Sequence, residues 1–123
     1  MTKYNKQISI LEKIIRYCEQ IGKTTERFGK TYEIFSGDFD YQNSCAMCIF
    51  QIGELASRLP EDFRVKYDQI PWKLIRGMRN MFAHEYEKVS LVRMWATIET
   101  DIPMLKAQCE EVLRLLLEEK AQS

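Results

Sequence analysis

The scarcity of residues that break helices is the strongest constraint on the fold of this chain. The 123 residues include five glycines and three prolines, whereas average usage would place roughly fifteen of the two in a chain this long. Sandwiches and barrels need many tight turns, so this composition disfavours them and favours a few long helices. The length fits one domain with a buried core, and we expect residues 1–123 to form a single helical domain.

Apolar residues recur along the chain at spacings of three and four, which is the pattern of amphipathic helices. The pattern predicts an all-α fold, an antiparallel bundle of four main helices with a short extra helix between the second and the third. Ser90 and either Asp38 or Asp40 are the predicted N-caps. The first main helix is predicted over residues 8–35 with a bend near Gly22, and the second follows Asp38 or Asp40 and ends before Pro60, after which a short helix begins. The third opens at residues 70–72 with Pro71 near its first turn, and ends near residue 83. The last is predicted over residues 91–116 with a kink or break at Pro103.

The charges balance, with 18 Lys and Arg against 18 Asp and Glu. A net charge of zero excludes capture of nucleic acid by the whole surface but permits a local basic site. A single histidine excludes a multi-histidine metal cluster within one chain, and we expect neither a metal nor a cofactor. The longest apolar run, Cys45 to Phe50, is far shorter than the ~20 residues that span a bilayer. We therefore expect a cytoplasmic protein without a membrane partner.

The four cysteines raise the question of a metal or redox site, because Cys45-Ala-Met-Cys48 has the CxxC form. A zinc site would need a second CxxC or a nearby histidine, and a thioredoxin-type site would need a βαβ pattern. Neither accompanies this segment. We favour the plainer interpretation that cysteines three residues apart line the buried face of a helix.

The segment from Arg76 to Tyr86 carries most of the chemistry, because it holds the only histidine beside two arginines, an amide and a phenol. Arg76 and Asn80 are four residues apart and share one face of a helix, as do Asn80 and His84. Arg79 and His84 are five apart, which places them about 140° apart around the axis. They converge only if the helix loosens near His84 or if a second chain contributes.

This set of groups fits metal-free cleavage of RNA. The reaction needs an acid and a base, which a histidine can provide, and positive charge at the phosphoryl oxygens, which Arg79 can provide. One chain offers one histidine, so a symmetric dimer that brings two copies of His84 into one cleft becomes a mechanistic expectation. The same residues also fit a structural role in which His84 ends a helix and the arginines pair with acids, and residue chemistry alone favours that role.

A resemblance changes this balance. Arg79-Asn80-Met-Phe-Ala-His84-Glu-Tyr86 matches the R-x4-H-x-Y signature of the HepT-like toxins of the HEPN superfamily. The resemblance covers most of the chain between residues 38 and 113. Three further segments resemble elements of that family: Ile52-Gly53-Glu54-Leu55-Ala56, Ile70-Pro71-Trp72 with the residues that lead to Asn80, and Thr100-Asp101-Ile102-Pro103-Met104-Leu105.

The resemblance implies a four-helix HEPN domain that forms a homodimer and cleaves RNA without metal at the dimer interface. It implies that Arg79 stabilises the transition-state phosphate, that His84 transfers protons and that Asn80 assists by hydrogen bonding. It also implies a type VII-like toxin–antitoxin pair. The partner would be a MntA-like minimal nucleotidyltransferase, which uses ATP to transfer AMP to Tyr86 and so silences the toxin.

Several alternatives stay open at this level. Glu54 on the second helix is either a support of the active site or a structural partner of an arginine such as Arg79 or Arg76, and Arg76 is itself a possible support. Trp72 and Trp95 fit base stacking, although core packing is the interpretation that we favour. Two other functions compete with the ribonuclease: a non-catalytic binding subunit of a minimal nucleotidyltransferase, and a purely structural helical dimer.

Overall fold

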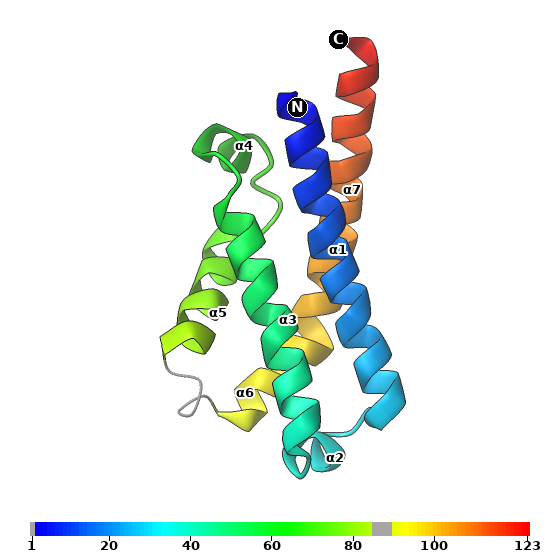
Figure 1. The fold of residues 1–123 in the computed structure, drawn as a ribbon, viewed down its shortest axis with the longest axis vertical. Helices are drawn as coiled ribbons and strands as arrows, with labels where there is room; N and C mark the ends of the chain where they lie inside the picture. The colour runs from blue at the N-terminus through cyan, green and yellow to red at the C-terminus, as the bar shows by residue number, and fades with distance from the viewer. Residues whose placement is uncertain (1, 85–89) are drawn as a thin grey trace.

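The computed structural model describes residues 2–84 and 90–123, and within these residues 81–84 only through their backbone. All regular structure in these ranges is helical, which confirms the predicted all-α class. The elements, labelled in Figure 1, are α1 (Lys3–Phe28), α2 (Tyr32–Ser36), α3 (Phe39–Ser57), α4 (Glu61–Lys66), α5 (Trp72–His84), α6 (Leu91–Ala96), the π-helical segment η2 (Thr97–Asp101) and α7 (Ile102–Gln122).

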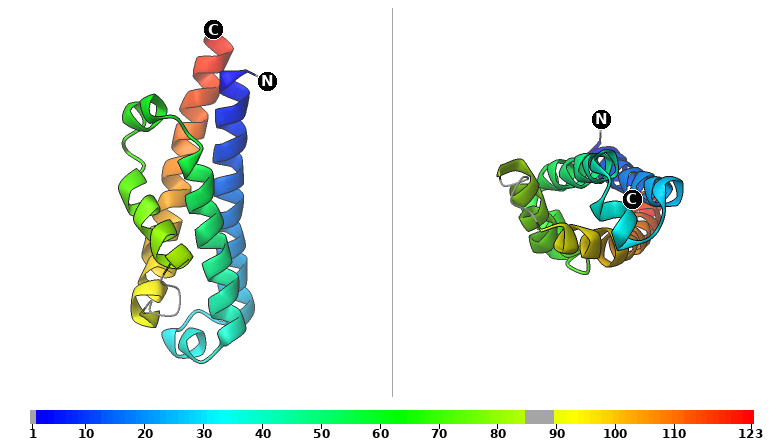
Figure 2. Two further views of the ribbon diagram at one scale, coloured as in Figure 1. Left: turned by 60° about the vertical axis from the view of Figure 1, so that its left-hand side comes forward. Right: turned by 90° about the horizontal axis from the view of Figure 1, so that it is seen from below.

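The long helices alternate in direction. In Figure 1 the chain descends along α1, returns along α3, descends along α5 and rises again through α6, η2 and α7, so both termini lie at the same end. The short helix α4 lies at that end, between α3 and α5, as predicted, and α2 lies at the opposite end (Figure 2). Among the described residues, α1 packs along both α3 and α7, whereas α5 packs mainly along α3.

Two predicted N-caps are confirmed. The carboxylate of Asp38, rather than that of Asp40, accepts a hydrogen bond of 3.1 Å from the backbone N–H of Tyr41 at the start of α3. Ser90 precedes α6, and its hydroxyl accepts from the N–H of Arg93 at 3.5 Å. Such caps satisfy N–H groups that have no partner within the helix, so they fix where each helix begins.

The predicted bend near Gly22 is wrong. The helix α1 runs through Gly22 without interruption, because one glycine inside a helix lowers its stability but leaves its hydrogen bonds intact. The break comes instead at Gly29, whose φ of 123° is strained for any residue with a side chain. The N–H of Gly29 donates to the carbonyl of Thr25 at 2.9 Å and closes the helix. Residues 32–36 therefore form the separate helix α2.

The last main helix is interrupted at Pro103, as predicted. Proline has no N–H to donate and its ring collides with the preceding turn, so a regular helix cannot pass through it unchanged. The chain accommodates Pro103 near the first turn of α7 by adopting the wider π-helical geometry of η2 directly before it. On the core side of this region, Trp95 packs against Phe35 with ring centroids 5.3 Å apart, so the core role expected for Trp95 is confirmed.

The four cysteines are free thiols in the core. Burial raises the pKa of Cys18, Cys45 and Cys109 to about 12, and raises that of Cys48 as well. A thiol binds metal or reacts as its thiolate, which this environment disfavours. The buried helix-face interpretation of the CxxC pair is therefore confirmed.

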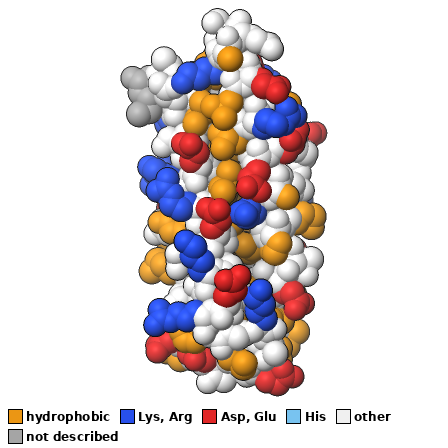
Figure 3. Space-filling model, turned by 90° about the vertical axis from the view of Figure 1, so that its right-hand side faces the viewer, with side chains coloured by type: hydrophobic (Ala, Val, Ile, Leu, Met, Phe, Trp, Pro, Cys, Tyr) orange, Lys and Arg blue, Asp and Glu red, His pale blue; other side chains and the backbone are white. Residues whose placement is uncertain are grey.

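Charged side chains of both signs are interspersed on the face of the bundle that Figure 3 shows. On α7, Arg114 pairs with Glu111 at 2.6 Å and with Glu118 at 2.7 Å. Lys106 lies 4.0 Å from Glu19 of α1, an ion pair that joins the two helices. Arg114 and Lys106 thus each have acidic neighbours. None of the helices within the described ranges is long and apolar enough to cross a membrane.

Candidate active site

The helices α3 and α5 are in close contact where Gly53 lies against Arg79. A Cβ atom added to Gly53 would lie 2.7 Å from Cγ and 3.2 Å from Cα of Arg79, which is too close for either pair. Gly53 is also buried. The absence of a side chain at this position therefore allows the backbone of Arg79 to sit directly on α3.

Three neighbours hold the Arg79 side chain. Its Nε donates to Oε1 of Glu54 at 2.5 Å, and its Nη1 donates to Oδ1 of Asn80 at 3.0 Å. The guanidinium carbon lies 6.0 Å from the ring centroid of Phe50, within the range of a cation–π contact. Of the two arginines considered as partners of Glu54, Arg79 and Arg76, the structure pairs it with Arg79. The Arg79 and Glu54 side chains are 34% and 33% exposed, so a ligand in solvent can reach them.

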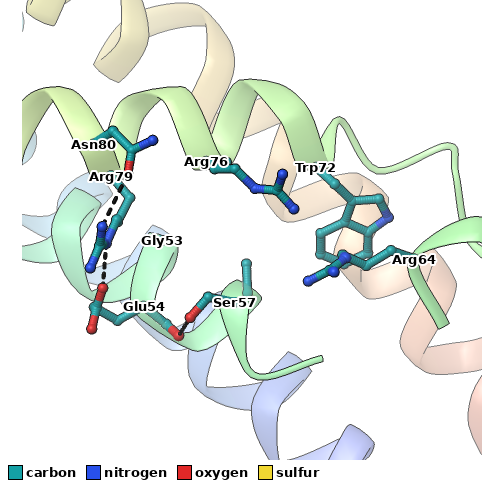
Figure 4. A pocket seen from close by; sticks show the side chains of 9 residues that line it. Gly53, Glu54, Ser57, Arg64, Trp72, Arg76, Arg79 and Asn80 are labelled. Carbon is teal, nitrogen blue, oxygen red and sulfur yellow. Dashed lines mark hydrogen bonds and ion pairs between the residues drawn. The ribbon is translucent and has the colours of Figure 1, made fainter. Parts of the chain in front are cut away.

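A pocket of about 320 Å³ opens beside this pair (Figure 4). Figure 4 shows Arg79 and Asn80 at one end of the pocket, Arg64 and Trp72 at the other, and Arg76 between them. Three arginines and one glutamate leave the pocket with an excess of positive charge, which suits an anionic ligand such as a phosphodiester. Its lining residues are Gly53, Glu54, Ala56, Ser57, Arg64, Trp72, Arg76, Arg79 and Asn80.

The far end of the pocket is fixed by the segment that leads into α5. The indole Nε1 of Trp72 donates to the carbonyl of Tyr67 at 3.0 Å, and its ring lies 6.2 Å from that of Phe63. Arg64 donates to the carbonyl of Leu59 at 3.0 Å. Trp72 therefore combines a packing role with a place in the pocket wall. No sequence pattern indicates that Arg64 belongs to this pocket, because only the tertiary fold brings α4, which carries Arg64, close to α5.

The sequence-predicted site residues fall into two groups. Arg76, Arg79 and Asn80 all lie on the pocket, together with Glu54 from α3. His84 is the last residue of α5, and the backbone is α-helical up to it. The side chain of His84 and the whole of Tyr86 lie outside the described residues.

Comparison with known proteins decides the family. The model of the family described as "Ribonuclease HepT-like" matches residues 11–112, which is most of the chain. The chain belongs to the HepT-like ribonuclease family. The matched range contains the α3–α5 pocket and the whole R-x4-H-x-Y motif of this HepT-like chain.

Curated relatives of this HepT-like chain carry ribonuclease names. "Putative RNase TTE0752" from Caldanaerobacter subterraneus is 44% identical over 63 residues, which cover 51% of this chain and 56% of the relative. "Putative RNase MJ0125" from Methanocaldococcus jannaschii is 34% identical over 93 residues, 68% of this chain and 80% of the relative. "Probable ribonuclease HepT" from Thermococcus cleftensis is 36% identical over 61 residues, 50% of this chain and 56% of the relative. The match thus spans little more than half the length of two of them. No solved structure matches the chain significantly.

Proposed function

We propose that this chain is an endoribonuclease that cleaves RNA without a metal ion, in a cleft between two copies of itself. The observation that carries the proposal is the α3–α5 pocket, where Arg79 is held in place by Glu54 and Asn80 beside two further arginines. The family and the names of the relatives support the same reaction class.

Arg79 is the residue best placed to bind the reacting phosphate. Among the described residues, hydrogen bonds engage its Nε and Nη1, and Nη2 has no partner. Because Glu54 and Asn80 fix the plane of the guanidinium, a phosphoryl oxygen meets donors that need no rearrangement as negative charge develops on it. Glu54 acts through Arg79, so in this proposal it is a positioning residue.

The helical course of α5 supports a site shared by two chains. Because α5 is α-helical up to His84, residues 79 and 84 differ by about 140° around its axis. Loosening of the helix before His84, one of the two ways in which these residues could converge, therefore has no support in the described backbone. We propose that Arg79 of one protomer works with His84 of the other, with His84 as the proton-transfer residue.

An exposed apolar stripe on α3 suits the dimer contact. Met47 is 60% exposed, and Phe50 follows three residues later on the same face of the helix, with Glu54 one turn beyond. Phe39, which is 69% exposed, lies two turns before Met47. The stripe leads to the Arg79–Glu54 pair, so a second copy packed on it would bring its own residues to the pocket.

Cleavage of a labelled RNA in EDTA tests the reaction. The wild-type protein should cleave, and the Arg79→Ala and His84→Ala variants should each lose activity by about 100-fold or more while keeping their helical circular dichroism. A His84→Ala variant that cleaves at the wild-type rate would remove His84 from the mechanism. Tight binding of a nucleotidyltransferase with no RNA cleavage would favour the non-catalytic binding subunit instead.

Mixed dimers test whether the site is shared. Arg79→Ala and His84→Ala protomers are each inactive alone, yet a heterodimer that joins them keeps one intact composite site. Co-expression of the two with different affinity tags should recover up to half of the wild-type rate per dimer. If each site instead lies within one protomer, the heterodimer will stay inactive.

The substitution Met47→Glu tests the dimer contact itself. It should shift the protein towards the monomer in size-exclusion chromatography, and the rate of RNA cleavage should fall as the dimer is lost.

The proposal extends to the regulation of the protein as a toxin. A nucleotidyltransferase antitoxin that transfers AMP from ATP to Tyr86 would place a bulky anion two residues from His84, where it competes with the RNA phosphate for the same positive charge. Cells that express the active antitoxin should therefore survive the wild-type toxin but not the Tyr86→Phe variant. Neutralisation of Tyr86→Phe by AMP transfer would contradict this assignment.

A further inference from the structure

A second hollow on the described surface has purely positive charge. It lies between α1 and α3, has a volume of about 430 Å³ and is called here the α1–α3 groove. Every charged residue in its lining is a cation, in contrast to the mixed lining of the α3–α5 pocket. The groove is lined by Lys13, Arg16, Tyr17 and Gln20 from α1 and by Gln51, Leu55 and Arg58 from α3 and its C-terminal end.

The cations of the groove differ from those on α7. Within the described residues, Lys13, Arg16 and Arg58 make no ion pair, whereas Arg114 pairs with two glutamates. Like charges that face one hollow repel one another and gain nothing for folding. A chain whose net charge is zero has nevertheless concentrated three unpaired cations at this place. Binding of an external anion would reduce the repulsion among these cations.

The α1–α3 groove and the α3–α5 pocket flank the same part of α3. Gly53, Glu54 and Ser57 line the pocket, while Leu55 and Arg58 line the groove, so residues of the same two turns alternate between the two hollows. A helix with its side chains is about 10–12 Å wide, a width that a few nucleotides of single-stranded RNA can cross. Glu54 is the one carboxylate among the residues that line the two hollows, and its charge is already paired with that of Arg79.

We propose that the α1–α3 groove binds phosphates of the same RNA strand that is cleaved in the α3–α5 pocket, a few nucleotides away from the reacting bond. Lys13, Arg16 and Arg58 contact the phosphates, and the partly buried ring of Tyr17 offers a surface on which a base can stack. An acidic protein partner would satisfy the charge of the groove alone, whereas a nucleic-acid strand also accounts for its position beside the pocket. The inference rests on the proposed ribonuclease function.

Charge reversal of the groove tests the inference directly. The test variant combines Lys13→Glu, Arg16→Glu and Arg58→Glu. The matched control combines Lys3→Glu, Lys6→Glu and Lys23→Glu, which are exposed positions on α1 that line neither the pocket nor the groove and give the same net charge. Both are made in the His84→Ala background, so that RNA binding is measured without cleavage. The probe is a fluorescein-labelled single-stranded RNA of 16 nucleotides, followed by anisotropy across a salt series.

The groove variant should bind this RNA about tenfold more weakly than the control at moderate salt. The slope of log affinity against log salt should fall by about 2, the loss expected for three phosphate contacts with a single strand. With His84 restored, the groove variant should cleave the 16-nucleotide RNA more slowly but a dinucleotide substrate at the wild-type rate. Equal affinities and slopes for the two variants would overturn the inference.

The outcomes separate the two proposals. If the wild-type protein binds RNA through the groove but never cleaves it, the ribonuclease proposal fails, and the groove stands only as an RNA-binding site. If the wild type cleaves long RNA and the groove variant matches the control, the groove fails and the ribonuclease stands. Polyglutamate serves as a probe for an acidic protein partner. If the groove variant binds polyglutamate more weakly than the control but binds RNA equally well, the groove belongs to an acidic protein and the RNA assignment is overturned.

Discussion

The two sides of α3 are built differently. On one side, α1 packs along both α3 and α7, Leu11, Cys109 and Val112 are fully buried, and Arg114 of α7 pairs with two glutamates. On the other side, α5 packs mainly on α3, and three arginines and one glutamate line the pocket between the two helices. Cations that line an open pocket contribute little to folding, whereas apolar burial stabilises the bundle. That burial is concentrated on the side of α3 that faces α1 and α7, called here the closed side; the side that faces α5 is called the open side. The comparison predicts that stability and activity can be impaired separately.

The largest effect on stability should come from the closed side. Leu11 is completely buried in α1, so Leu11→Ala removes apolar contacts and leaves a cavity that the neighbouring helices cannot fill. The free energy of unfolding should fall by about 2–5 kcal/mol, as measured by urea denaturation. Under conditions where the variant stays folded, its rate of RNA cleavage should equal that of the wild type. A loss below about 1 kcal/mol would show that this side is less tightly packed than its burial indicates.

The open side should show the reverse behaviour. Arg79→Lys keeps the positive charge but removes the planar fork that bonds Glu54 and Asn80 at once. Cleavage should fall by about 100-fold. The free energy of unfolding should change by less than about 1 kcal/mol, because the Arg79–Glu54 pair is one-third exposed and screened by water. A large loss of stability in Arg79→Lys would mean that Arg79 is a structural residue.

Alanine substitutions at two glycines test how tightly α5 packs on α3. Gly53→Ala places a methyl group against Cβ and Cγ of Arg79 and should destabilise the fold by about 1–3 kcal/mol. Gly77→Ala, on α5 itself, meets nothing within 4 Å and should stabilise the helix by roughly 0.5–1 kcal/mol. Thermal unfolding of the pair checks the prediction. Similar shifts in melting temperature for Gly53→Ala and Gly77→Ala would show that α3 and α5 can move apart at Gly53 at little cost.

How far the sequence predicts this structure depends on whether a feature is local. The N-caps at Asp38 and Ser90 and the interruption at Pro103 follow from chemistry within one or two turns, and the structure confirms them. The bend assigned to Gly22 failed because two glycines seven residues apart look alike in sequence. Their difference lies in φ, which at Gly29 is set by how the chain must turn into α2.

The same limit applies to the candidate site. Arg76, Arg79 and Asn80 can be predicted from the sequence because they lie close together in the segment that carries the R-x4-H-x-Y motif. Glu54 stands out as a carboxylate on an apolar helix and as part of the segment Ile52–Ala56 that resembles the family, but its arginine partner stays open, because the choice depends on how α3 and α5 cross. Arg64 gave no signal, because its neighbours in sequence carry no motif and its place at the pocket is a product of the tertiary fold.

The smallest effect concerns a charged contact on the closed side. Glu119 of α7 accepts hydrogen bonds from Nζ of Lys66 at 2.6 Å and from the hydroxyls of Tyr67 at 3.0 Å and Tyr4 at 3.1 Å, so it ties α1 and the α4 segment to α7. These donors, Lys66 first and then Tyr67, lower the pKa of Glu119 below the 4.5 of an unperturbed glutamate. A carboxylate whose pKa is lower in the folded state stabilises the fold above about pH 4.5, and this contribution disappears as the pH falls through the lowered value. Glu119→Gln should therefore be slightly less stable than the wild type at pH 7 and should lose less stability between pH 5 and pH 3. Parallel stability curves for the two proteins over that range would show that the contact adds nothing to folding.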